Sequence, residues 1–109
     1  MTTAYKVLGQ SNPSAITNTT LYTVPAGNSA VISTVNICNQ ATTTANFRIA
    51  VRPLGAAISS QHYIAYNTNI PAYDSINITI GMTLAATDVV TVYANTATLS
   101  FNLFGSEIY

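Results

Sequence analysis

Strict alternation of apolar and polar side chains is the feature that most constrains this chain. Across residues 74–83, Ile or Met occupies every second position, and Ser, Asn, Thr and Gly fill the positions between them. This two-residue period is that of a β-strand with one buried face, because successive side chains point to opposite faces of a sheet. No segment shows the three- and four-residue apolar spacing of an amphipathic helix over three turns. The sequence therefore predicts an all-β fold.

Other segments are predicted to be strands by the same alternation or by their content of β-branched and aromatic residues. They are residues 5–9, 19–24, 30–39, 46–52, 62–67, 88–94 and 98–105. Residues 88–94 are apolar on both faces and should form a central strand, whereas residues 5–9 should form an edge strand. Residues 55–61 have room for one short turn of helix. Turn residues recur at about ten-residue spacing, which favours a single antiparallel β-sandwich, jelly-roll-like, with about eight strands.

One turn pattern occurs twice. Both copies have the same order: a β-branched residue, Pro, Ala, any residue, Asn or Asp, and Ser. They are residues 24–29 and 70–75. Proline ends the donation of ladder hydrogen bonds, and an Asn or Asp side chain closes a turn. Residues 83–90 are a looser variant. Two explanations stay open: convergent turn chemistry, or equivalent corners of a jelly roll built from two related halves.

Charge is scarce in this chain. Only 6% of the 109 residues are charged and the formal net charge is +0, whereas soluble domains typically carry about 25% charged residues. Such a neutral surface offers little repulsion between copies, which favours a part fixed in an assembly. Lys6, Arg48 and Arg52 are too few to hold nucleic acid or an anionic membrane. No membrane-spanning run or signal-peptide pattern occurs, and the length indicates one domain, residues 1–109.

Chemically reactive residues are few and scattered. Asp74 and Asp88 begin predicted strands, where their ordinary role is to cap a turn, and Glu107 is the third acid. His62, the single histidine, is expected near a rim or an interface. Cys38, the single cysteine, is expected to be a buried inert thiol. The sequence thus predicts no catalytic residue, no metal site and no cofactor, and we do not expect an enzyme.

Arginine and tyrosine supply the candidate interface residues. Arg48 and Arg52 share one face of a predicted strand and have few acids to pair with. A solvated outer face is the ordinary explanation. Because Arg is enriched in interfaces, we predict that both lie on a subunit or partner contact. Tyrosine serves protein interfaces and sugar stacking equally well, and Tyr63, Tyr66 and Tyr73 are close enough in sequence to form one patch. The candidate interface residues are Arg48, Arg52, Tyr63, Tyr66, Tyr73 and Tyr109.

The sequence is similar to that of a known group of proteins in several segments, which are residues 21–40, 47–57, 62–75 and 84–108. Through these segments the chain resembles small all-β virion proteins of tailed bacteriophages, notably phages of cyanobacteria. The resemblance implies a β-sandwich that decorates or cements a capsid, or one that forms part of a tail or baseplate. A cement protein bridges capsomers from outside, often as a trimer. The short chain has no collagen-like or coiled-coil stalk, which favours head decoration over a tail fibre.

The leading hypothesis is a capsid decoration or cement protein located on the virion. Its expected partners are the major capsid protein and further copies of itself, with a trimer favoured. Residues of about 1–14 and 105–109 are expected to be arm-like termini, at least one of which contacts a neighbouring subunit. The alternatives are a tail or baseplate adaptor and a host-glycan-binding module that stacks sugars on tyrosine.

Overall fold

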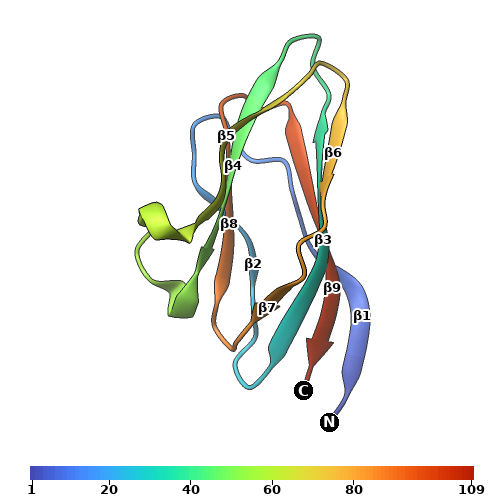
Figure 1. Cartoon of the computed structure of the whole chain (residues 1–109), viewed down its shortest axis with the longest axis vertical. Coiled ribbons are helices and arrows are strands. Elements are labelled where there is room, and N and C mark those ends of the chain that lie inside the picture. Colours follow the sequence, from blue (N-terminus) through green and yellow to red (C-terminus); the bar gives the residue numbers. More distant parts are fainter.

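The computed structural model describes residues 1–109 as two antiparallel sheets packed face to face (Figure 1). Sheet A has the strand order β1-β9-β3-β6, with β7 also paired to β3, and sheet B has the order β2-β8-β4-β5. The strands are β1 Thr3–Ser11, β2 Thr19–Thr23, β3 Ser29–Asn39, β4 Ala45–Arg52, β5 Tyr63–Ile70, β6 Ser75–Ile78, β7 Met82–Leu84, β8 Val89–Ala94 and β9 Leu99–Ile108. No helix has the length and apolar character needed to cross a membrane.

This strand order is that of a jelly roll in which one strand is broken into β6 and β7. The predicted all-β, jelly-roll-like sandwich of antiparallel strands is therefore confirmed. β8 lies between β2 and β4, as expected for a strand that is apolar on both faces, and β1 is an edge strand. β5 and β9 continue beyond their predicted ends. The predicted turn of helix at 55–61 is replaced by short 3-10 turns at Pro53–Gly55 and Ser60–His62.

The repeated turn pattern marks two equivalent corners of the sandwich. Both turns carry the chain from sheet B to sheet A, from β2 to β3 and from β5 to β6. The N–H of Asn28 donates to the carbonyl of Pro25 at 3.1 Å, and that of Asp74 donates to Pro71 at 3.2 Å. The residue just before each donor has a positive φ, 84° at a glycine and 58° at Tyr73. The geometry thus favours equivalent corners over unrelated turns.

The prediction of one continuous strand over residues 74–83 is wrong, because the strand is interrupted between Ile78 and Met82. The stretch between these two residues is one residue longer than the part of β3 with which it pairs. The extra residue is accommodated at Gly81, whose φ is 61°. As a result Ile80 leaves the expected buried face and is 51% exposed.

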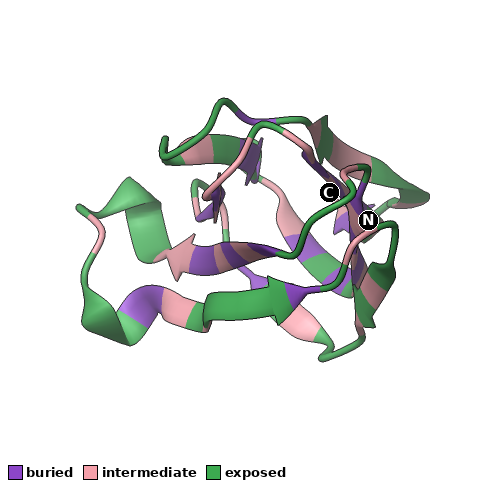
Figure 2. Ribbon diagram, turned by 90° about the horizontal axis from the view of Figure 1, so that it is seen from above, coloured by how far each residue is buried: buried purple, intermediate pink, exposed green.

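The core fills the space between the sheets, where the inward side chains of both sheets meet. Figure 2 marks the buried residues in purple, and they occur on strands of both sheets. At its centre the rings of Phe47 and Phe101, one from each sheet, lie edge to face with centroids 6.2 Å apart. The largest side chains that are fully buried are Phe47, Phe101, Ile32, Ile37, Ile49, Ile70, Leu99 and Leu103. Their burial is the main favourable term in folding a chain of this size.

A buried amide joins the loops at one end of the sandwich. Asn39 is 1% exposed, and its Nδ2 donates to the carbonyls of Thr43, Ile70 and Pro71 at 2.9 to 3.2 Å. Its Oδ1 accepts from the backbone N–H of Ala41 at 3.0 Å. One side chain therefore ties the loop after β3 to the corner after β5, and its own polar atoms are satisfied without water.

The two termini pair with each other inside sheet A. β1 and β9 are antiparallel along nearly their whole length, and Thr2 and Tyr109 exchange backbone hydrogen bonds in both directions. The arms expected at residues 1–14 and 105–109 are therefore replaced by paired strands. The physical reason is that the N-terminal segment forms the backbone hydrogen bonds of an edge strand over Thr3–Ser11. The sequence predicted this strand only over residues 5–9.

We expect Asn39→Ala to lower the free energy of unfolding by about 2–3 kcal/mol, because the loop carbonyls and the N–H of Ala41 lose their hydrogen bonds to the buried amide. Asn69→Ala is the matched control, since Asn69 is exposed on β5 and its side chain makes no hydrogen bond within the chain. Urea unfolding of the two variants measures the difference. Equal loss in both would show that the Asn39 amide does not hold these loops.

Candidate interaction surface

Arg48 occupies the middle of the outer face of sheet B. Its guanidinium carbon lies 4.4 Å from the ring centroid of Tyr66 and 4.2 Å from that of Tyr93. Its Nε donates to Oδ1 of Asn67 at 2.7 Å. β4 and β8 set Arg48 directly opposite Tyr93. Each cation–π contact contributes about 0.5–1 kcal/mol at an exposed site, so the guanidinium is held in one position while its charge remains accessible.

Irregular pairing of β5 brings Tyr66 against Arg48 and Tyr63 against Tyr66. The register between β4 and β5 shifts twice, and Asn67 has a φ of 50°. Such bulges re-aim side chains at the edge of a sheet. Here they leave the rings of Tyr63 and Tyr66 edge to face, with centroids 4.9 Å apart. Together with Ser60 these rings line an open hollow of about 320 Å³.

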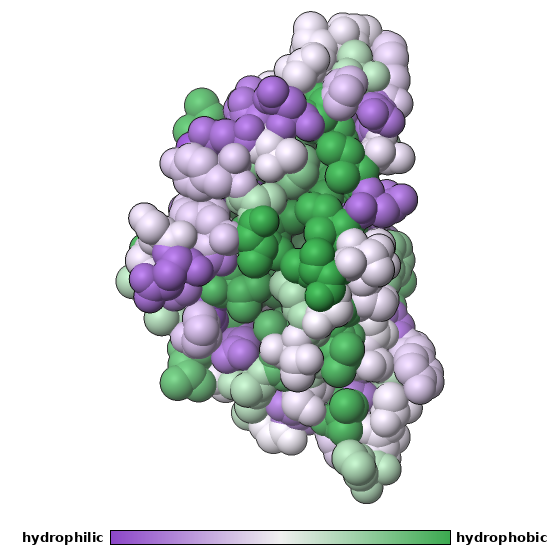
Figure 3. Space-filling view, in the orientation of Figure 1, coloured by the Kyte–Doolittle hydropathy of each residue, from purple (hydrophilic) through white to green (hydrophobic).

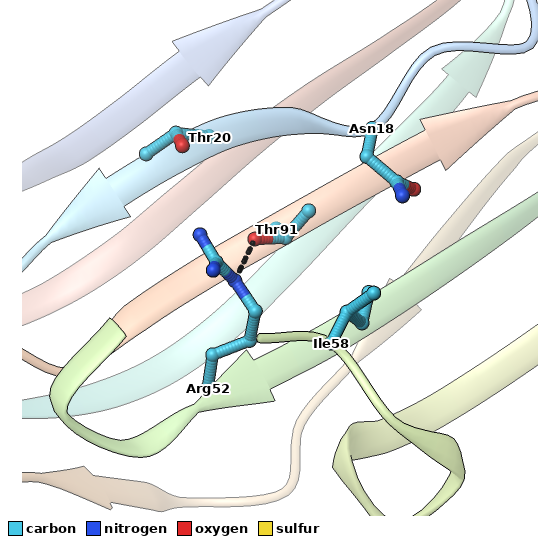
Figure 4. A pocket seen from close by; sticks show the side chains of 5 residues that line it. All are labelled: Asn18, Thr20, Arg52, Ile58 and Thr91. Carbon is cyan, nitrogen blue, oxygen red and sulfur yellow. Dashed lines mark hydrogen bonds between the residues drawn. The ribbon is translucent and has the colours of Figure 1, made fainter. Parts of the chain in front are cut away.

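Arg52 lies further along the same strand, at a second hollow. Its Nε donates to Oγ1 of the buried Thr91 at 3.1 Å, and its Nη1 donates to the carbonyls of Gly55 and Ala56. Nη2 makes no hydrogen bond within the chain. The hollow has a volume of about 180 Å³, and Figure 4 shows the hydrogen bond from Arg52 to Thr91 on its floor. The side chains that line it are Asn18, Thr20, Arg52, Ile58 and Thr91.

We name this surface the arginine–tyrosine face. Its members are Arg48, Arg52, Tyr63, Tyr66 and Tyr93. Neither of its hollows is lined by a carboxylate, a histidine or a thiol. The face thus combines two cations with aromatic rings and neutral hydrogen-bonding groups, a composition that is enriched in protein interfaces.

Two of the three acids close turns, as predicted. Oδ1 of Asp74 accepts from the N–H of Ser75 at 2.8 Å. Asp88 accepts from the N–H of Ala85 at 2.9 Å and from that of Leu54 at 3.0 Å. Asp88 directly precedes Val89, the residue that pairs with Arg52. It nevertheless forms no ion pair with either arginine, and the one salt bridge of the chain lies elsewhere.

That salt bridge belongs to Glu107, the third acid, which is buried between the sheets. Its Oε1 lies 2.6 Å from Nζ of Lys6, and its Oε2 accepts from the hydroxyl of Tyr22 at 2.5 Å. The hydrogen bonds from Lys6 and Tyr22 hold the pKa of Glu107 below its usual value, against the opposing effect of burial. Burial, and then the adjacent carboxylate, raise the pKa of Tyr22. The cluster joins β1 and β9 of sheet A to β2 of sheet B.

The structure brings together four of the six predicted interface residues. Arg48, Arg52, Tyr63 and Tyr66 lie on one outer face, as described above. Tyr73 lies instead in the corner after β5, where its N–H donates to the carbonyl at residue 41, so the predicted patch of three tyrosines does not form. Tyr109 ends the chain beside β1, in the other sheet.

Sequence reasoning missed Tyr93 because its strand is apolar on both faces, so alternation did not reveal which side chains meet Arg48. That contact depends on the register between β4 and β8, which are far apart in sequence. The Glu107 cluster was missed for the same reason. Its one local signal is that a single acidic residue occupies an inward position of β9, where the residues two and four positions before it are Gly and Leu.

Cys38 and His62 depart from expectation. Cys38 is half-buried rather than buried, because alternation along β3 points its neighbours Ile37 and Asn39 into the core. His62 is buried in a 3-10 turn before β5, and its Nδ1 accepts from the N–H of Ser59 at 3.1 Å. No group of three or more metal-ligating side chains lies close together.

A second exposed feature is the open flank between the sheets. Figure 3 shows a strip of apolar side chains along the opening between sheet A and sheet B. Half-buried apolar side chains that pack against the core from β5, β6 and β7 are Ala65, Ile76, Ile78 and Met82. We name these four residues the apolar flank. Water reaches part of the core there, so covering the flank is favourable.

Comparison with known proteins adds no relative. No family model and no curated protein matches the chain. Fold and surface therefore define the class: a small jelly-roll domain with two arginines and three tyrosines on the outer face of one sheet. The likeness to phage virion proteins stays a prediction that rests on residues 21–40, 47–57, 62–75 and 84–108.

Stability should depend on pH through the Glu107 cluster. Glu107 has a lowered pKa in the folded state, so its contribution is present above about pH 4.5 and is lost as the pH falls. Tyr22 has a raised pKa, so its contribution is lost above about pH 10, where the unfolded chain ionises first. We expect urea midpoints to fall on both sides of this window.

Two variants separate the limbs of that profile. Glu107→Gln should lower the stability at pH 7 by about 1–3 kcal/mol and flatten the acid limb. Tyr22→Phe should reduce the alkaline limb and weaken the acid limb only in part, because Lys6 still bonds Glu107. An unchanged acid limb in Glu107→Gln would assign the acid sensitivity to other carboxyl groups.

Proposed function

We propose that this protein is a structural component of a phage virion, which binds the outside of the capsid shell and stabilises it by bridging capsomers. The observation that carries the proposal is the arginine–tyrosine face, where Arg48 and Arg52 have no carboxylate partner in their own chain. The resemblance to virion proteins supplies the setting. The role is mechanical, and no bond is made or broken.

The chemistry of the face indicates what it binds. Arg48 is already fixed between two rings and Arg52 is fixed by three hydrogen bonds, so little side-chain entropy is lost on docking. Both guanidiniums keep charge that attracts carboxylates, and Arg binds them with paired hydrogen bonds. The partner is therefore expected to be an acidic patch on the major capsid protein.

Bridging requires a second contact, and the apolar flank supplies one. The flank opens between the sheets, whereas the arginine–tyrosine face covers the outside of sheet B, so one copy has separate surfaces for two neighbours. With a formal net charge of +0, copies seated side by side repel one another little. Three copies docked around a local threefold position of the shell would form the trimer that the resemblance implies, on the capsid rather than in free solution.

A glycan-binding role is the second candidate, and the hollow at Ser60, Tyr63 and Tyr66 is what favours it. Tyrosine rings stack on sugars, and a serine hydroxyl beside them bonds sugar hydroxyls. Specific signals on a glycan array, lost in Tyr66→Ala, would support this role over capsid docking.

Charge reversal tests the docking surface. We expect Arg48→Glu with Arg52→Glu to weaken co-sedimentation with undecorated capsids at least about tenfold, because two attractive contacts become repulsive. Thr83→Glu, on an exposed position of sheet A, is the matched control and should bind as the native chain does. Arg48→Lys keeps the charge and should lose less. Binding that is unchanged in the double variant, with its fold intact by circular dichroism, would contradict the proposal.

The number of copies on purified virions separates capsid from tail. A decoration protein should be present in many copies per shell, in fixed ratio to the major capsid protein. A tail or baseplate adaptor forms one small closed ring per particle, and finding so few copies would replace the capsid proposal. Quantitative mass spectrometry of virion proteins measures the ratio.

A further inference from the structure

β1 presents an unpaired edge of sheet A. It pairs with β9 alone, and Figure 1 shows it as the outermost strand on its side of the molecule. Thr2 and Tyr109 exchange both backbone bonds, and in an antiparallel pair this exchange recurs at every second residue. The N–H and C=O groups of Thr3, Tyr5 and Val7 therefore point away from β9. Nothing in the chain accepts or donates to them.

β1 is also the best-formed edge in the molecule. β2 has 5 residues and a register shift, β5 has two shifts, and the edge made of β6 and β7 is broken. In β1 the only shift comes after Val7, so the stretch from Thr3 to Val7 is regular. A regular open edge is a template for another strand.

The usual protection of such an edge is absent. Proteins commonly place an exposed lysine on an edge strand to prevent pairing. Here Nζ of Lys6 is bonded to the buried Glu107, so its charge is neutralised on the inner side of the sheet. Tyr5 is 85% exposed and Val7 is 49% exposed, and Val7 lies opposite the exposed Phe104 of β9, whereas Tyr5 lies opposite Ser106.

We propose that two copies of this chain associate through antiparallel pairing of their β1 edges about a two-fold axis at Tyr5. In this register Thr3 pairs with Val7 of the second copy and Tyr5 with its own equivalent, which satisfies every outward group through about six hydrogen bonds. Lys6 faces the small Ala4 of the second copy, so like charges do not meet. The two A sheets become one continuous sheet, and the exposed Tyr5 and Val7 side chains of both copies form one apolar strip.

This contact is self-complementary, as a two-fold interface must be. It uses the edge of sheet A, so it is independent of docking by the arginine–tyrosine face of sheet B. Loss of one contact therefore leaves the other intact, and the two proposals fail separately.

Light scattering after size exclusion, over a range of concentrations, tests the pairing. We expect the native chain to have twice the monomer mass, and Tyr5→Pro to be a monomer, with a dissociation constant raised at least about tenfold by the loss of paired edge groups. Proline is tolerated where the N–H of an edge strand faces solvent. Tyr5→Thr keeps that N–H and is the matched control, which should remain a dimer. A native chain that is monomeric at every concentration overturns the proposal.

Cross-linking decides the case even if Tyr5→Pro fails to fold. In a Cys38→Ser background, Tyr5→Cys places two thiols on facing residues about 5.5 Å apart at Cα, within reach of a short bis-maleimide. We expect covalent dimers from Tyr5→Cys and few from Ile64→Cys, an exposed position on β5. Equal cross-linking at both positions, or a native trimer whose mass Tyr5→Pro does not change, overturns edge pairing and leaves capsid docking standing.

Discussion

All three acidic side chains of this protein accept hydrogen bonds from their own chain, and the remaining surface chemistry depends on that constraint. Asp74 and Asp88 accept backbone hydrogen bonds at corners, and Glu107 is buried between the sheets. The fold therefore leaves no acid to neutralise Arg48 and Arg52. In a chain of which 6% is charged, these two cations dominate the field on one face, which is why we propose an acidic neighbour for that face.

The Glu107 cluster also determines how the chain ends are used. Lys6 and Glu107 come from the first and last strands, and Tyr22 comes from the opposite sheet. A buried carboxylate is stable only when it is paired and hydrogen-bonded, so β1 must stay against β9. Termini held in this way cannot act as arms. The same pairing turns the lysine charge inward and leaves the outer edge of β1 open to another strand.

Alternation along the chain predicted the all-β class, the central position of β8 and the edge position of β1, because these depend on which faces are buried. The corner turns were visible because Pro and Asn or Asp fix local geometry. The break near Gly81 and the contact of Arg48 with Tyr93 could not be predicted, since both depend on register between strands distant in sequence. A one-residue bulge moves such contacts without altering composition.

Some candidate interface residues are placed by local alternation, and others are placed by the register between distant strands. Arg48 and Arg52 lie on one strand, so their shared face follows from the two-residue period alone. Tyr66 joins them only because bulges re-aim β5, whereas Tyr73 is carried off by a corner. The two arginines, which local periodicity places on one face, and the tyrosine rings, which strand pairing brings beside them, thus form one rigid surface. Since each guanidinium is already fixed by its own chain, the proposed acidic partner would meet a preorganised site, and its affinity would depend on two arginines rather than on the area covered.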